Sequence, residues 1–239
     1  GSEICIRGRA ALLLFVIVSL ENVGRSKQKT ELGAVLNKSP AIQRLAAARF
    51  FLFGSRDIWF VVALPVFLDE ALAWTYEAIG AFLACWVIGY GIVQSLAPRV
   101  LSALRGTPLG AFGLLLPMAA TAILIAVSVV MDELKAVITV VGLVGFGIMF
   151  ALTSSVHSYL ILAYSTSDDE TALDVGFYYS ANAGGRLVGT LLSGFLFLVG
   201  GFPAALIGTA VFLIVAFVIS WGLPALPTSN VQNANVAVS

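Results

Sequence analysis

Three arginines lie inside long apolar segments of this chain, where a charge is costly. Arg49, Arg56 and Arg186 each cost about 2.5–3.5 kcal/mol at the centre of a membrane helix on insertion scales. A guanidinium presents a planar fork of N–H donors that suits carboxylate or phosphate oxygens. Asp57 is the one acid embedded deeply beside them, so the arginines keep a positive surplus. The residues therefore predict a substrate-binding site for an organic anion, and the alternative is a buried structural ion pair.

The depth of each arginine in its helix distinguishes candidates for substrate binding from an arginine that extends to the membrane interface. Arg56 and Arg186 are each 11 residues from the same end of their helices, so both lie about 17 Å deep. Adjacent residues on a helix do not face each other, so we expect Asp57 to reach Arg186 on another helix rather than Arg56. Arg49 is only about 6 Å from its helix end, and we expect its side chain to extend to the interface. It remains a weaker candidate for substrate binding.

Polar residues recur every fourth position in the fifth apolar segment. Asp174, Tyr178, Asn182 and Arg186 share this spacing, which places them along one stripe of a helix. The stripe predicts a polar path toward the mid-depth arginines. We take Tyr178 and Asn182 as further substrate-binding candidates, and Asp174, like Asp57, as a residue for ion coupling or charge pairing.

Small residues form a second stripe on the same segment. Ala181, Gly185, Gly189 and Ser193 also repeat every fourth position, the small-xxx-small pattern that lets helix backbones approach closely. This stripe predicts a helix-packing face and carries no information about substrate.

His157 is the single histidine of the chain, and it shares a predicted helix face with Ser154. It is a candidate for proton coupling, with a packing role as the alternative. One histidine and two cysteines, Cys5 and Cys85, do not support a zinc site or a disulfide framework. No H-E-x-x-H motif and no glycine-rich phosphate loop occurs. We therefore expect that the protein is not an enzyme, and that it has no catalytic residues, no metal site and no cofactor.

Composition identifies the elements that position these residues. Apolar residues make up 59% of the 239 positions and charged residues only 11%, against roughly 25% charged in soluble domains. The net charge is zero, which does not favour nucleic-acid binding. A bilayer core takes about 20 apolar residues of helix, and the apolar segments are too long and uniform for barrel strands. We predict an all-α membrane bundle of six transmembrane helices at residues 45–68, 74–96, 108–130, 136–164, 175–199 and 203–223.

The remaining segments complete the predicted organisation. Residues 1–20 hold a short apolar stretch that looks like the remnant of a preceding transmembrane helix, and residues 21–44 form a basic linker. Residues 45–223 form the bundle, and residues 224–239 are expected to be disordered. Seven basic residues of the linker and the second loop lie on one side of the bundle against Lys135 on the other. The positive-inside rule therefore places the linker and the C-terminus in the cytoplasm of a multi-pass protein.

Four segments carry a resemblance to a known family. They are AARFFLFGSRDIWF (47–60), WVIGYGIVQSLAP (86–98), DVGFYY (174–179) and NAGGRLVGTLLSG (182–194). With six helices behind a basic linker, the chain resembles the C-terminal half of a major facilitator transporter, and the segments resemble the ArsJ family of organoarsenical exporters.

The resemblance implies a secondary carrier of the bacterial inner membrane that exports 1-arseno-3-phosphoglycerate and contributes to arsenate resistance. It implies a functional link to glyceraldehyde-3-phosphate dehydrogenase, which makes this compound, and a proton as the coupling ion. Since the two halves of such carriers are related repeats, we expect a missing N-terminal half or a second copy as partner, within the lipid bilayer. The alternatives are a six-span structural or interaction module, or an inactive truncated half-transporter.

Overall fold

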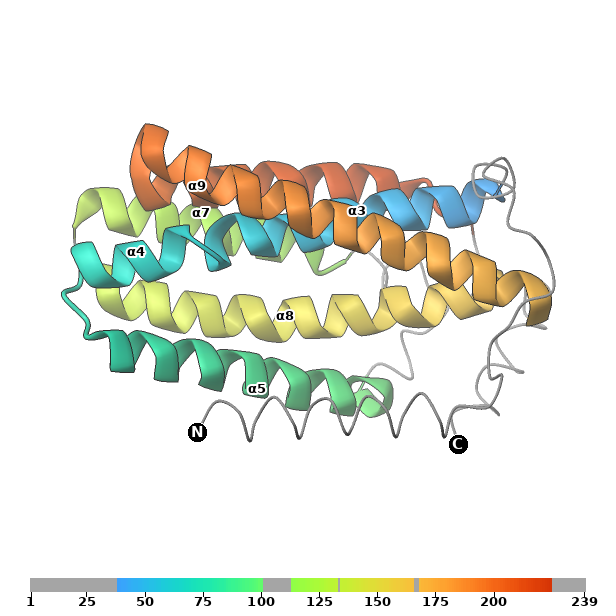
Figure 1. The fold of residues 1–239 in the computed structure, drawn as a ribbon, viewed down its shortest axis with the longest axis horizontal. Coiled ribbons are helices and arrows are strands. Elements are labelled where there is room, and N and C mark those ends of the chain that lie inside the picture. Colours follow the sequence, from blue (N-terminus) through green and yellow to red (C-terminus); the bar gives the residue numbers. More distant parts are fainter. Residues whose placement is uncertain (1–37, 101–112, 133, 166–167, 225–239) are drawn as a thin grey trace, which may run out of the picture. The chain divides into compact units, whose positions relative to one another are not determined.

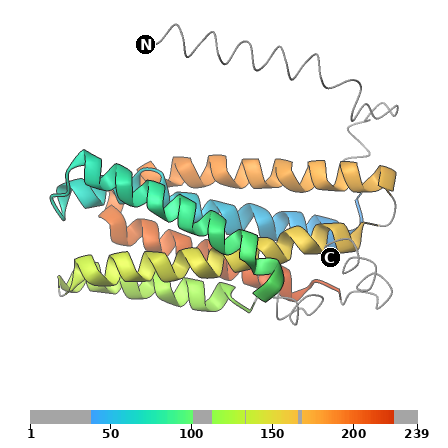
Figure 2. The same ribbon diagram turned by 90° about the horizontal axis from the view of Figure 1, so that it is seen from below.

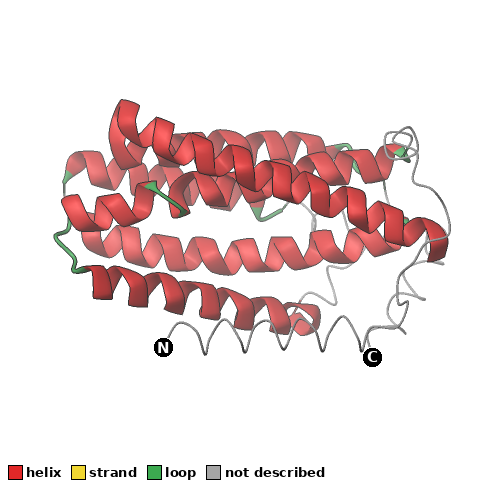
Figure 3. Ribbon diagram, in the orientation of Figure 1, coloured by secondary structure: helices red, strands yellow, loops and turns green. Residues whose placement is uncertain are grey.

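A computed structural model describes residues 38–100, 113–132, 134–165 and 168–224. The chain divides into two units, residues 1–36 and 37–239, and every described residue belongs to the second. Its helices are α3 (Pro40–Phe60), α4 (Ala63–Glu70), α5 (Tyr76–Val100), α7 (Leu115–Met131), α8 (Lys135–Tyr164) and α9 (Asp168–Trp221). The described residues contain helices and short connections and no strand (Figure 1, Figure 3). The expected all-α membrane bundle is confirmed.

The helix bounds agree with most of the predicted spans. Among the described residues, four helical segments are long and apolar enough to cross a membrane, and Leu115–Met131 is a shorter apolar helix. The longest helix, α9, holds the predicted fifth and sixth spans and reverses direction at Gly200 and Gly201, which have non-helical backbone angles (Figure 1). Gly201 has a φ of 64°, a conformation that glycine adopts without steric cost. The predicted segment 1–20, most of the linker, residues 108–112 and all of the predicted tail 224–239 except Pro224 lie outside the described residues.

The first predicted span lies within one candidate membrane span, Pro40–Glu70, but its helix is interrupted, which corrects the expectation of a continuous helix. The break lies at Val61 and Val62, between α3 and α4. Pro65 explains it, because a proline ring clashes with the carbonyl of the residue four positions earlier, here Val61, and has no N–H to donate. The hydroxyl of Ser193 on α9 accepts hydrogen bonds from the backbone N–H groups of Val62 and Ala63 at 3.2 and 3.0 Å. The freed amides are thus satisfied by a neighbouring helix.

Helices α3 and α9 pack with their backbones in close contact. A Cβ atom added at Gly185 would lie 2.1 Å from the carbonyl oxygen of Phe50, and one added at Gly189 would lie 2.5 Å from that of Gly54. Near the same contact, the hydroxyl of Thr209, on the returning part of α9, donates to the carbonyl of Ser55 at 3.0 Å. The small residues of α9 therefore lie against α3, as their four-residue spacing suggests.

Aromatic side chains join α5 to the rest of the bundle. The indole N–H of Trp86 donates to the carbonyl of Leu143 on α8 at 2.9 Å, and its ring meets that of Trp59 on α3 edge to face. Gly147 leaves room for this indole, since an added Cβ would lie 2.9 Å from it. Apolar side chains elsewhere on α5 are exposed, among them Ile88 and Ile92. Figure 1 shows α5 beside α8 along the lower side of the bundle, and Figure 2, seen from below, shows α5 crossing obliquely in front of the bundle.

The close contact of α3 and α9 predicts a specific sensitivity to added volume. Gly185→Ala should destabilise the folded chain by about 1–3 kcal/mol, because overpacking forces a backbone shift. Gly194→Ala on the same helix is the matched control, since a Cβ there meets nothing within 4 Å. Thermal unfolding of both variants in one detergent measures the difference. Equal melting temperatures would contradict the contact.

Candidate functional site

Asp57 binds both mid-depth arginines at once. Its Oδ1 accepts hydrogen bonds from Nε and Nη2 of Arg56 at 2.7 and 2.5 Å, and its Oδ2 accepts from Nε of Arg186 at 3.1 Å. Arg56 and Asp57 belong to α3, whereas Arg186 comes from α9. The carboxylate therefore links two helices whose backbones are already in close contact.

The bond to Arg186 lies where the depth argument expects it, but the bond to Arg56 corrects that argument. Adjacent side chains leave a helix in different directions, yet the long arginine side chain folds along α3 until its fork reaches the neighbouring carboxylate. The cluster contains two guanidiniums and one carboxylate, so it keeps one uncompensated positive charge.

Exposure differs greatly among the three side chains. Asp57 is 1% exposed and Arg56 13%, whereas Arg186 is 56% exposed. Arg186 bonds Asp57 through Nε, and this is the hydrogen bond that the structure gives it within the described part of the chain. Its two terminal nitrogens have no hydrogen bond to the described residues, and such a pair of donors is suited to the paired oxygens of an oxyanion. The arrangement can therefore bind one anionic group at Arg186 without first breaking the bond to Asp57.

Arg49 is buried, which corrects the expectation that its side chain extends to the interface. The residue is 3% exposed. Its Nη1 donates to the carbonyl oxygen and the hydroxyl of Ser154 on α8 at 3.1 and 3.0 Å. The physical reason is that α3 begins at Pro40, five residues before the predicted start, so Arg49 lies more than two turns inside the helix.

Phe53 connects Arg49 and Arg56, a role that the sequence analysis missed. The guanidinium carbon of Arg49 lies 4.0 Å from the centroid of the Phe53 ring, and that of Arg56 lies 5.3 Å from it. Residues four and three apart share a helix face, so the order Arg49, Phe53, Arg56 carried this signal. Cation–π attraction at such distances contributes about 0.5–2 kcal/mol per pair.

The structure brings together some of the other candidate residues and separates the rest. Tyr178 is fully buried, and its ring lies 4.8 Å from the guanidinium carbon of Arg49. His157 is buried on α8, one turn from the Ser154 that binds Arg49. Asn182, one turn from Tyr178 along α9, is partly buried with an Oδ1 that lacks a hydrogen-bond partner.

Asp174 lies apart from the arginine cluster, three helical turns before Arg186 on α9. Its carboxylate pairs with the amine of Lys38 at 2.9 Å and accepts a hydrogen bond from the hydroxyl of Ser165 at 3.2 Å. These contacts connect the start of α9 with the chain just before α3. In this structure Asp174 therefore has a charge-pairing contact at the bundle end.

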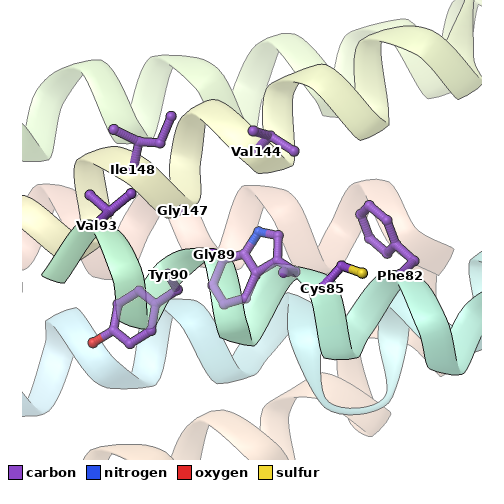
Figure 4. Close-up of a pocket in the computed structure, with 9 residues that line it drawn as sticks. Phe82, Cys85, Gly89, Tyr90, Val93, Val144, Gly147 and Ile148 are labelled. Carbon is purple, nitrogen blue, oxygen red and sulfur yellow. The ribbon is translucent and has the colours of Figure 1, made fainter. Parts of the chain in front are cut away.

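The pocket shown in Figure 4 lies elsewhere, between α5 and α8, with a volume of about 360 Å³. Its lining is almost entirely apolar and includes no arginine: Phe82, Cys85, Trp86, Gly89, Tyr90, Val93, Val144, Gly147 and Ile148. Cys85 is an exposed free thiol. Within the described ranges, no group of three His, Cys, Asp or Glu residues is placed to hold a metal. The charged cluster is therefore the better candidate for binding an anion.

Comparison with known proteins gives one match. The family model described as Major Facilitator Superfamily matches residues 10–237. No curated protein and no solved structure matches the chain.

The shared carboxylate predicts a large effect of its removal. Asp57→Asn should destabilise the chain by about 3 kcal/mol, the lower end for breaking a buried ion pair, because Arg186 is partly exposed and solvent screens its share. Asp132→Asn is the matched control, since Asp132 pairs with Lys135 at an exposed turn and should change stability little. Melting temperatures in detergent measure both. A similar shift in the two variants would show that the cluster does not stabilise the bundle.

Proposed function

Because the chain belongs to the Major Facilitator Superfamily, a family of membrane transporters, we propose that it serves in a secondary carrier for a small organic anion. Arg186 and Arg56 bind the anion, and Asp57 orients both guanidiniums. In this superfamily, substrate sites lie near the bilayer midplane at the interface between repeated halves. Arg56 lies near the middle of the candidate span Pro40–Glu70, and Arg186 lies near the middle of the predicted fifth span, residues 175–199, which supports a site at that depth.

The observation that carries the proposal is the imbalance of charge at Asp57. One carboxylate binds two guanidiniums, so one positive charge has no acidic partner among the described residues, and such a charge is costly inside a membrane. An anionic ligand offsets that cost while it is bound. The exposed side of Arg186 gives it access, and the fork of Arg186 offers paired donors to carboxylate, phosphate or arsenate oxygens.

The resemblance to organoarsenical exporters supplies the more specific proposal. It names 1-arseno-3-phosphoglycerate as the exported substrate, arsenate resistance as the outcome and glyceraldehyde-3-phosphate dehydrogenase as the enzyme that provides the substrate. This compound carries the oxyanion groups that the arginines suit. The protein would lie in a bacterial inner membrane. The excess of basic residues on one side of the bundle supports an orientation in which the linker faces the cytoplasm. An ion gradient, such as that of protons, drives the export.

A second candidate function is a structural or interaction module, which the bonds of both arginines to Asp57 favour. In that case the cluster only holds α3 and α9 together. Replacing Arg56, Asp57 and Arg186 together by Met, Leu and Met would then be tolerated, because well-packed apolar residues often substitute for a buried ion pair. The anion-carrier proposal expects that variant to insert normally and to be inactive.

Loss of either mid-depth arginine should abolish the activity. We expect Arg186→Gln and Arg56→Gln to lose arsenate resistance in sensitive cells that express the chain together with the dehydrogenase, since a lost charged contact weakens binding by about 10–100-fold. Arg44→Gln is the control, because Arg44 donates to the carbonyl of Gly222 at the end of the bundle. Resistance that both variants retain would refute the proposal.

A binding measurement tests the proposed anion site independently of the proposed arsenical substrate. Equilibrium dialysis of the detergent-solubilised chain with ³²P-labelled 3-phosphoglycerate tests the anion site alone. Binding that requires Arg186, without resistance from the unmodified chain, would retain the anion carrier and reject the arsenical substrate.

A further inference from the structure

Arg49 is a buried cation without an acidic partner. Its two hydrogen bonds come from Nη1 and end on Ser154, and no carboxylate pairs with it within the described residues. Its Nε is buried and has no hydrogen-bond partner. A buried charge is normally paired, and a buried donor left unsatisfied costs about 1–3 kcal/mol or more when charged. Arg49 therefore retains both charge and donor capacity.

Arg49 lies close to the anion site proposed above. The guanidinium carbons of Arg49 and Arg56 are 4.0 and 5.3 Å from the centroid of one ring, that of Phe53. The distance between the two carbons therefore cannot exceed the sum of these values. That separation suits two oxyanion groups joined by a short carbon chain, and the Phe53 ring between the arginines offers apolar contact for the chain.

The charges of the three arginines and Asp57 fit such a ligand. Arg49, Arg56 and Arg186 contribute three positive charges and Asp57 one negative charge. A ligand with a single charged group would leave Arg49 as it is, uncompensated. A ligand with an oxyanion at each end would compensate the surplus positive charge both at Arg49 and at the cluster of Asp57, Arg56 and Arg186.

We propose that Arg49 forms a second oxyanion subsite, so that the carrier selects small bis-anions with a short carbon linker over mono-anions. The inference rests on the proposed anion site at Arg186 and Arg56 and adds a specificity-determining residue to it. One oxyanion group binds Arg186 and Arg56 at the open side, and the other binds Nε of Arg49.

Tyr178 controls access to this subsite. Its fully buried ring lies 4.8 Å from the guanidinium carbon of Arg49, and Phe53 covers the guanidinium as well. Because Arg49 is 3% exposed, the second subsite is closed in this structure, and side chains that cover Arg49 have to move before a ligand contacts it. Arg186, which is exposed, therefore takes the first group and Arg49 the second.

Two phosphate esters that differ in charged groups test the inference. Equilibrium dialysis of the chain in detergent compares ³²P-labelled glycerol 1,3-bisphosphate with glycerol 1-phosphate. We expect Arg49→Gln to weaken binding of the bisphosphate by about 10–100-fold, the effect of one lost charged hydrogen-bonding contact, and to leave the monophosphate within about threefold. Arg44→Gln, the matched arginine on the same helix with a bond to a backbone carbonyl, should change neither.

The possible outcomes are distinct. Equal effects of Arg49→Gln on both esters, or no preference of the unmodified chain for the bisphosphate, would overturn the second subsite. Binding of both esters that survives Arg186→Gln would overturn the proposed anion site itself. If Arg49→Gln lowers the melting temperature strongly, Arg49→Lys decides the matter. Lysine keeps the positive charge but lacks the paired donors of the guanidinium, so this variant should lose part of the preference for the bisphosphate. An unchanged preference would contradict a role of the Arg49 guanidinium.

Discussion

The described bundle depends on one carboxylate that binds two guanidiniums. Asp57 is nearly inaccessible, and it can bind Arg186 only because α9 approaches α3 closely at Gly185 and Gly189. The small residues of α9 therefore have a consequence for charge as well as for packing. They bring a cation from one helix within reach of an acid on another, and the surplus charge that remains is what a carrier for anions needs.

The apolar lengths of the sequence were enough to predict the helices and the contact of Asp57 with Arg186, but not the burial of Arg49. Runs of about 20 apolar residues predict membrane helices because the bilayer requires that length. Helix ends and interruptions were harder to predict. The start of α3 at Pro40 is set by a proline in the first turn and by Ser39 as N-cap, within what had been interpreted as linker. The break before α4 follows from Pro65, a signal present in the sequence and not used.

Contacts of the candidate site that follow from the position of a residue along its helix were predictable from the sequence. Contacts that depend on the conformation of a long side chain were not. Equal depth on two helices suggested the contact of Asp57 with Arg186. The contact with Arg56 depends on how a long flexible side chain folds, which spacing along a helix does not determine. The burial of Arg49 depends on Ser154 and Tyr178 from two other helices, so only the tertiary structure reveals it.

The interruption between α3 and α4 has a mechanical consequence. The eight residues of α4 form a helix of about 12 Å, and the hydroxyl of Ser193 connects its first residues to α9. Arg49 and Arg56 lie on the separate helix α3. Tilting α4 stretches two bonds to one side chain and leaves the Asp57 cluster in place. A bend at this interruption can therefore change the direction of α4 without displacing Arg49, Arg56 and Asp57, which all lie on α3.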